Sequence, residues 1–125
     1  MLTLTIRTDK PEAEVGLYED ETPLSYETWQ AHRQLAESLH KQIANILETQ
    51  NRQLSDVTGI VCYKGPGSFT GLRIGLSVAN ALAYSLEVPV ISTHGEGWQI
   101  IGISCLRDGD DERVALPEYG SEIFI

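Results

Sequence analysis

Apolar and polar residues alternate along the first thirty positions of the chain. Residues 2–7 alternate as a half-buried strand, and residues 14–18 and 24–29 predict two more strands. Residues 20–23 contain acidic residues followed by Thr and Pro, which predicts the turn of a hairpin between the second and third strands. The opening third of the chain is therefore expected to form an antiparallel meander.

The pattern changes to helical spacing after residue 30. Residues 31–50 predict an amphipathic helix, whose apolar positions are Leu35, Leu39, Ile43, Ile46 and Leu47. Its other side carries Ala36, His40 and Ala44, and these small or modest groups leave room for a neighbouring helix to pack.

A strand, a helix and a strand follow. Residues 59–63 form a short apolar run, residues 72–86 a helix-forming run ended by Val88-Pro89, and residues 88–91 another strand. The order predicts an α/β domain, a mixed sheet with two main helices in which parallel strands extend the meander. Residues 98–105 fit helix or strand, with strand favoured for the second half, and residues 113–116 and 123–125 predict short extended pieces.

A glycine-rich turn joins the strand at 59–63 to the next helix. It contains Gly65, Pro66, Gly67, Ser68 and Thr70, where the glycines permit unusual backbone angles, Pro66 stiffens the bend, and Ser68 or Thr70 can cap the helix. Three residues separate Gly67 from Gly71 and no Lys follows, so the spacing fits neither a P-loop nor the dinucleotide-binding fingerprint. A structural turn is favoured over a phosphate site. Arg73 is expected to anchor this turn or to pair with an acid of a partner.

Small residues recur every four positions along the second helix. They are Gly71, Gly75, Ala79 and Ala83, which form one flat stripe. Two glycines in a helix interior indicate close approach of another backbone, either the chain's own sheet or a partner. The partner interpretation predicts a contact surface made of His40, Ala44, Gly71, Leu72, Gly75, Leu76, Ala79 and Ala83. It also predicts that Gly75→Leu blocks binding and leaves the domain folded.

The run from Gly65 to Gly75, with the strand before it and the Ala-rich helix after it, resembles the TsaB (YeaZ) family of bacterial tRNA threonylcarbamoyladenosine synthesis. The resemblance covers about residues 1–97, and Pro117-Glu118-Tyr119 resembles a Pro-x-Tyr found late in that family. It implies a ribonuclease-H-like domain of the actin and hexokinase superfamily. Residues 98–125 are then expected to be a shortened extension in place of the family's second domain.

The same resemblance implies a non-catalytic dimerisation subunit. Such a subunit packs its helices against a TsaD-like catalytic partner in an assembly with an ATPase subunit, and forms a homodimer when alone; threonylcarbamoyl transfer belongs to TsaD. In ATP-handling relatives of the superfamily the first strand ends in an acidic residue, whereas this chain has Arg7. No catalytic residues and no cofactor are therefore expected. The alternatives are a small nucleotide-binding hydrolase or peptidase-like enzyme, and a regulatory homodimer that has lost the tRNA role.

Composition and charge limit the kinds of partner and the location that are expected for this chain. Nine basic and eighteen acidic residues give a net charge of −9, which disfavours direct contact with nucleic acid. Apolar stretches are too short to cross a membrane and no secretory signal is recognisable, so a cytoplasmic protein is expected. Cys62 and Cys105 are expected to be reduced core residues. The acidic run at 108–112 lacks the spacing of a calcium loop, which favours a solvated turn and no metal site.

Overall fold

The first three strands form the predicted antiparallel meander. In the computed structural model, which describes residues 1–118, β1 (Leu2–Arg7) pairs with β2 (Glu12–Glu19), and β2 pairs with β3 (Thr22–Gln30). The hairpin turn is shorter than expected, because Thr22 and Pro23 already belong to β3. Only Asp20 and Glu21 separate the two strands.

Two parallel strands complete the sheet. β4 (Gly59–Tyr63) lies beside β1, and β5 (Val90–Thr93) lies beside β4, which gives the order β3-β2-β1-β4-β5. Helix α2 (Phe69–Leu86) makes the crossover between β4 and β5 and begins three residues before its predicted start. The mixed α/β sheet is therefore confirmed.

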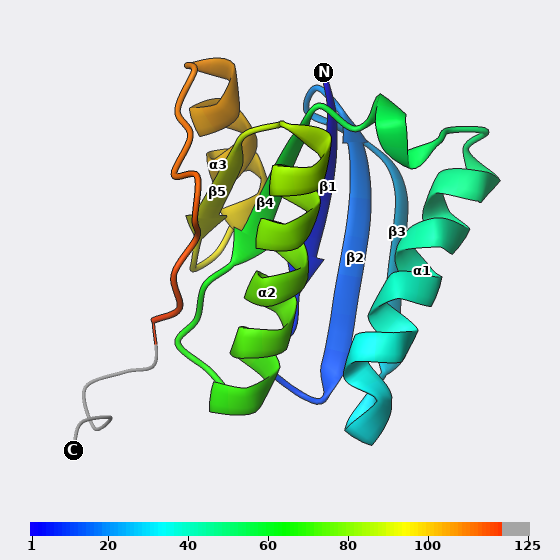
Figure 1. Cartoon of the computed structure of the whole chain (residues 1–125), viewed down its shortest axis with the longest axis vertical. Helices are drawn as coiled ribbons and strands as arrows, with labels where there is room; N and C mark the ends of the chain where they lie inside the picture. Colours follow the sequence, from blue (N-terminus) through cyan, green and yellow to red (C-terminus); the bar gives the residue numbers. More distant parts are fainter. Residues whose placement is uncertain (119–125) are drawn as a thin grey trace.

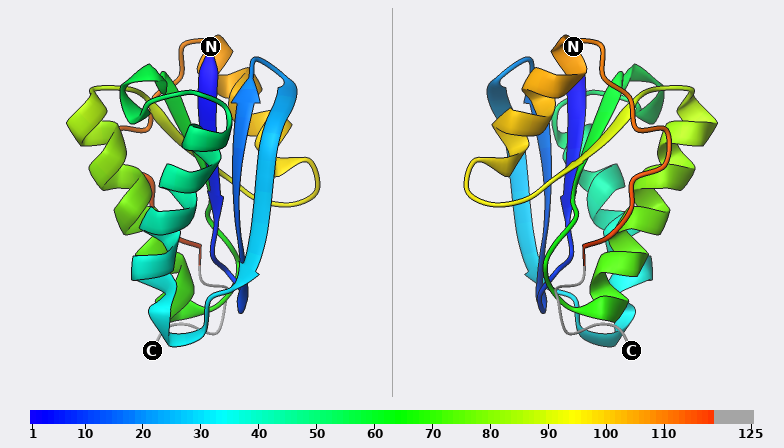
Figure 2. Two further views of the ribbon diagram at one scale, coloured as in Figure 1. Left: turned by 90° about the vertical axis from the view of Figure 1, so that its right-hand side faces the viewer. Right: turned by 90° about the vertical axis from the view of Figure 1, so that its left-hand side faces the viewer.

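Helices cover both faces of this sheet (Figures 1 and 2). α1 (Leu35–Thr49), which follows the 3-10 turn η1 (His32–Gln34), lies with α2 on one face. A second 3-10 turn, η2 (Leu54–Asp56), leads from α1 to β4. The other face carries α3 (Trp98–Arg107), so the strand favoured for the second half of 98–105 is wrong. No helix in residues 1–118 is long and apolar enough to cross a bilayer.

The central strand β1 is buried on both faces rather than half-buried. Leu2, Leu4 and Ile6 belong to the core beneath α1 and α2, while the alternate residues Thr3 and Thr5 are also buried. Their hydroxyls have no hydrogen-bond partner in the structure. The polar residues that suggested a solvent face are threonines, whose short side chains fit under the second layer.

Residues 110–118 run back along the sheet after α3, and we call this segment the strap. It lies beside β5 and α2 in Figure 2, where it is drawn in orange and red. Residues 113–116 contain no strand, which corrects the expected extended piece there. The other expected piece, 123–125, and Tyr119 of the Pro-x-Tyr sequence lie outside the described residues.

Candidate functional site

The glycine-rich turn is held by the loop that follows β1. The Ser68 N–H donates to the Asp9 carbonyl at 2.9 Å, and the Ser68 hydroxyl accepts from the Gly71 N–H at 3.4 Å as the helix N-cap. Gly65 has a φ of +110°, a conformation that glycine adopts readily. Of the two expected caps, Ser68 fills the role, while Thr70 lies exposed within α2.

The glycines of α2 approach the same loop closely. A Cβ on Gly71 would collide with the carbonyl oxygen of Thr8, and a Cβ on Gly75 would collide with the Thr8 hydroxyl. That hydroxyl donates to the Gly71 carbonyl at 2.7 Å, and Thr8 is only 1% exposed. The glycines therefore serve close packing of α2 against the end of β1.

This packing corrects the expected partner surface. Within the chain itself the stripe and its flanking residues face the sheet, and the buried members are Leu72, Gly75, Leu76, Ala79 and Ala83. Gly71, which is half-buried, lies against Thr8. Side chains that are already covered by β1 and β4 are not available to a partner, so the own-sheet alternative holds for these six residues.

The outward surface of the helix pair is different in character. The exposed Ala36, His40 and Ala44 follow one another along α1, and the exposed Thr70, Arg73 and Ser77 follow one another along α2. Two hollows open on this surface: the first lies between the second half of α1, residues 51–54 and Leu82 of α2, and the second lies in the seam between α1 and α2. One, of about 540 Å³, includes His40 and Ala44, and the other, of about 340 Å³, includes Ala36 and Ser77. We call these six residues the outer face; His40 and Ala44 remain a predicted partner contact.

Among residues 1–118, Arg73 contacts the Phe69 ring at the start of α2 and no residue of the glycine turn itself. It is exposed on the outer face, with its guanidinium carbon 5.2 Å from the centroid of the Phe69 ring. Of its two expected roles, pairing with an acid of a partner is the one that this position leaves open.

A charged group closes the carboxyl end of β1. The Arg7 guanidinium donates to both carboxylate oxygens of Asp9, at 2.7 and 3.2 Å, and lies 3.9 Å from the centroid of the Tyr63 ring. The hydrogen bond to Asp9 is the main reason that the pKa of Arg7 is raised. A bidentate pair stacked on an aromatic ring is a fixed arrangement. Arg7 and Asp9 thus neutralise each other here.

A tyrosine next to this group was not singled out from the sequence. The Tyr26 hydroxyl donates to Glu14 and accepts from the Gln99 amide at 2.9 Å, which links β2, β3 and α3. Burial is the largest cause of its raised pKa, with the Glu14 hydrogen bond second. Because its two partners come from two other segments of the chain, no local sequence pattern could have indicated it.

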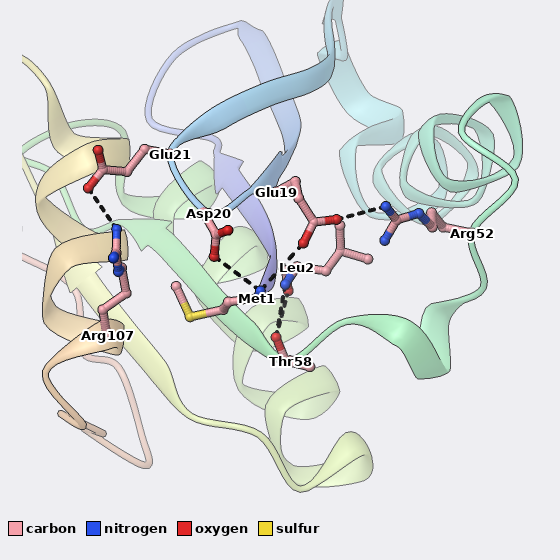
Figure 3. Close-up of polar contacts among 8 residues, drawn as sticks. All are labelled: Met1, Leu2, Glu19, Asp20, Glu21, Arg52, Thr58 and Arg107. Carbon is pink, nitrogen blue, oxygen red and sulfur yellow. Dashed lines mark hydrogen bonds and ion pairs between the residues drawn. The ribbon is translucent and has the colours of Figure 1, made fainter.

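The opposite end of the sheet is fastened by ion pairs (Figure 3). Glu19 accepts from Arg52 at 2.7 Å and from the Met1 amino group at 3.4 Å, and Arg107 at the end of α3 donates to Glu21 at 3.0 Å. The Arg52 hydrogen bond lowers the pKa of Glu19. These pairs tie the β2–β3 turn to segments that follow α1 and end α3, so this end is structural.

Metal-binding side chains do not gather anywhere in residues 1–118, where no group of three His, Cys, Asp or Glu residues could hold an ion. Cys62 is buried, and burial raises the pKa of its thiol; Cys105 is half-buried. The acidic run is not entirely the expected solvated turn, because Asp111 and Glu112 accept hydrogen bonds from β5.

Comparison of the sequence with known proteins shows the family to which the chain belongs. The model of the family TsaD, tRNA N6-adenosine threonylcarbamoyltransferase, matches residues 29–96. The tRNA threonylcarbamoyladenosine biosynthesis protein TsaB of Escherichia coli K12 is 35% identical over 96 residues, which cover 73% of this chain and 39% of that protein. The chain belongs to the TsaB (YeaZ) family. This confirms the resemblance stated from the sequence.

Solved structures agree with the TsaB (YeaZ) assignment. YeaZ from Pseudomonas aeruginosa superimposes with a TM-score of 0.69 at 29% identity, over 74% of this chain and 43% of that chain. RuvC of Thermus thermophilus matches with a TM-score of 0.52 at 14% identity, over 75% of this chain and 64% of that chain, a likeness of fold alone. These matches confirm the ribonuclease-H-like fold. The chain spans about two-fifths of the length of the TsaB and YeaZ relatives.

Proposed function

We propose that this protein is a non-catalytic subunit of tRNA threonylcarbamoyladenosine modification, which binds a TsaD-type transferase through the outer face of α1 and α2. The observation that carries the proposal is this face itself. It consists of exposed side chains on two adjacent helices, four of which are short (Ala36, Ala44, Thr70 and Ser77), and one hollow lies in the seam between the helices. Short side chains let a second pair of helices approach closely.

The family comparison supports a partner of related shape. The TsaD family model matches residues 29–96, a range that contains α1, β4, α2 and β5. A transferase of that family therefore has a segment related to the helix pair described here. Two related helix pairs can meet face to face about an approximate two-fold axis, in the manner of an isologous contact. The same logic supports a homodimer when the chain is alone.

The carboxyl end of β1 supports a non-catalytic role. Arg7 stands where ATP-handling relatives of the superfamily have an acid, and its bidentate pairing engages the Asp9 carboxylate, the acid that follows the strand. The net charge of −9 also opposes direct contact with tRNA. We therefore expect neither ATP hydrolysis nor tight ATP binding by the isolated protein, and micromolar affinity in a calorimetric titration would contradict this.

A matched pair of variants tests the partner surface. Ser77 is exposed on the outer face, while Ser104 is exposed on α3, on the opposite side of the sheet. Ser77→Arg places a long charged side chain in the seam, whereas Ser104→Arg makes the same change elsewhere. In a pull-down with the TsaD protein of the same cell, we expect Ser77→Arg to lose at least about tenfold in affinity, equal to about 1.4 kcal/mol.

The control decides the interpretation. Ser104→Arg should bind as the unchanged protein does, and both variants should melt at similar temperatures because both positions are exposed. Normal binding by Ser77→Arg would place the interface elsewhere. Absence of binding by the unchanged protein, with a symmetric dimer in light scattering that Ser77→Arg dissociates, would favour the regulatory homodimer instead.

A further inference from the structure

β5 is an edge strand whose composition favours pairing with another strand. Its four residues, Val90 to Thr93, carry no charge and no proline, and three of them are β-branched. Edge strands of this kind offer unpaired backbone groups to other chains unless something covers them. One side of β5 is paired with β4. The other side is where the strap lies.

The strap satisfies the outward backbone groups of β5 mainly with carboxylates. The Val90 N–H donates to Asp111 Oδ1 at 3.2 Å, and the Ser92 N–H donates to Glu112 Oε2 at 3.1 Å. The Ser92 hydroxyl donates to the other Glu112 oxygen at 2.7 Å. A single backbone bond, from the Glu112 N–H to the Val90 carbonyl at 2.9 Å, resembles strand pairing. The two side chains thus stand where the carbonyls of a sixth strand would be.

The strap is also fastened beyond β5. The Asn80 side chain of α2 donates to the Ala115 carbonyl at 3.0 Å and accepts from the Ala115 N–H at 2.8 Å. Further along, the Glu118 N–H donates to the Lys64 carbonyl at 2.7 Å, and the Glu118 carboxylate lies 3.2 Å from His94 Nδ1. On the other side of the β5 contact, the Asp110 N–H donates to the Cys105 carbonyl at 3.0 Å. The strap is therefore anchored before and after this contact, which holds the carboxylates in place.

We propose that the strap is an edge cap, and that the occupant it excludes is the β5 edge of a second copy of this chain. Two identical edges can pair antiparallel about a two-fold axis, since each offers the N–H groups of Val90 and Ser92 and the Val90 carbonyl. The strap uses these groups. It also places two negative charges at the edge, which repel the same charges on another copy.

The test removes the two carboxylates and compares their neighbours. Asp111→Ala/Glu112→Ala deletes both acceptors, while Asp108→Ala/Asp110→Ala makes the same charge change at neighbouring acids whose side chains accept no hydrogen bond from the described residues of β5. Both pairs are made in the Ser77→Arg background, so that association through the outer face does not contribute. Hydrogen exchange of the Val90 and Ser92 amides is followed by NMR, and mass by light scattering over a range of concentrations.

We expect exchange at Val90 and Ser92 to be at least tenfold faster in Asp111→Ala/Glu112→Ala at low concentration, and its mass to rise toward that of a dimer as concentration increases. The matched pair should stay protected and should not associate in this way. Equal exchange in both pairs would overturn the cap, and faster exchange without association would overturn the second copy as its occupant.

A single variant covers the case in which the double variant fails to fold. Glu112→Gln keeps one oxygen that can accept from the Ser92 N–H but loses the charge. We expect the exchange rate of the Ser92 amide in Glu112→Gln to stay within about threefold of the rate in the unchanged protein. In Glu112→Ala we expect this rate to rise at least tenfold. Equal exchange in these two variants would overturn the role of the Glu112 oxygens. Failure of Ser77→Arg to affect the TsaD partner would bear on the proposed function and leave this result unchanged.

Discussion

The two sides of α2 use small residues for opposite purposes. On the inner side Gly71 and Gly75 allow the helix to lie directly on Thr8, and Ala79 and Ala83 continue that contact along the sheet. On the outer side Ser77 and its neighbours stay exposed over a seam that nothing in residues 1–118 fills. One helix thus has a stripe of small residues that is already used and a surface that is still open.

The difference shows that small side chains every four residues indicate a close contact, but not whether the chain's own sheet or a partner makes it. The inner contact decides whether the chain folds, since it joins α2 to the buried centre of the sheet. Residues of the outer face can be substituted without disturbing the core, so this is the surface on which a partner can bind and distinguish one sequence from another. Substitutions on the two sides should separate stability from binding.

Gly75→Leu should have the largest effect, and it should act on folding. Its Cβ alone would collide with the Thr8 hydroxyl, so the whole side chain must push α2 away from β1. We expect a loss of about 3 kcal/mol or more in the free energy of unfolding, at the upper end of overpacking costs. This reverses the outcome predicted from the sequence. Denaturant melts of Gly75→Leu beside Ser77→Leu, which should stay within about 0.5 kcal/mol, check it.

A double-mutant cycle should show that Thr8 is the obstacle. Gly75→Ala adds only the Cβ, which we expect to cost about 1–3 kcal/mol beside the intact Thr8. In a Thr8→Ala background the hydroxyl and methyl groups are gone, and only the Cβ of residue 8, at 3.1 Å, opposes it. The two changes should therefore couple favourably by about 1 kcal/mol or more. Additive losses would mean that the inner contact is not limited by Thr8.

Asn80 lies on the flank of α2 between these two sides, where it binds the strap. Asn80→Ala removes both hydrogen bonds to the Ala115 backbone, and we expect a cost of about 1–2 kcal/mol. Asn80→Asp keeps the acceptor for the Ala115 N–H but loses the donor, so it should fall between the two. Urea melts of the three proteins give the order, and an unaffected Asn80→Ala would show that the strap adds nothing to the stability of the fold.

The smallest effect is expected far from α2, at the ion pairs of the β2–β3 turn. Arg52 lowers the pKa of Glu19, so its contribution is present above the ordinary Glu pKa of about 4.5 and is lost as pH falls. Arg52→Gln should lower the Tm slightly at pH 7, and the difference from the unchanged protein should shrink as pH falls below the ordinary Glu pKa and vanish below the lowered pKa of Glu19. A difference that grew on acidification would contradict this assignment.

Periodicity was sufficient for most of the fold. The alternation of residues 2–7 and the helical spacing of residues 35–47 each indicated the correct element, although β1 buries its alternate threonines as well as its apolar residues. By contrast, α3 was missed. It buries Trp98, Gly102, Ile103 and Leu106 but leaves Ile100 and Ile101 exposed, so apolar residues on both of its sides hid the helical period.

The candidate site was predictable only in part. The exposure of His40 and Ala44 on α1 followed from the helical pattern, because the buried positions of that helix were clear. Which residue packs against the glycines of α2 was not predictable, since Thr8 lies more than sixty positions earlier in the chain. Nor could the acidic run at 108–112 reveal that two of its members bind β5, because that contact depends on the path of the strap.

The turn that opens α2 has a further consequence for anions. The carbonyl oxygens of Thr8, Asp9 and Glu118 crowd the positions where Gly71, Gly67 and Gly65 would carry a Cβ. The Ser68 and Leu72 N–H groups are already bound to carbonyl oxygens. A phosphate entering this turn would meet these carbonyl oxygens, and the Ser68 and Leu72 N–H groups would not be available to it. The glycines of this turn thus serve its close packing against Thr8, Asp9 and Glu118, which supports a structural turn over a phosphate site.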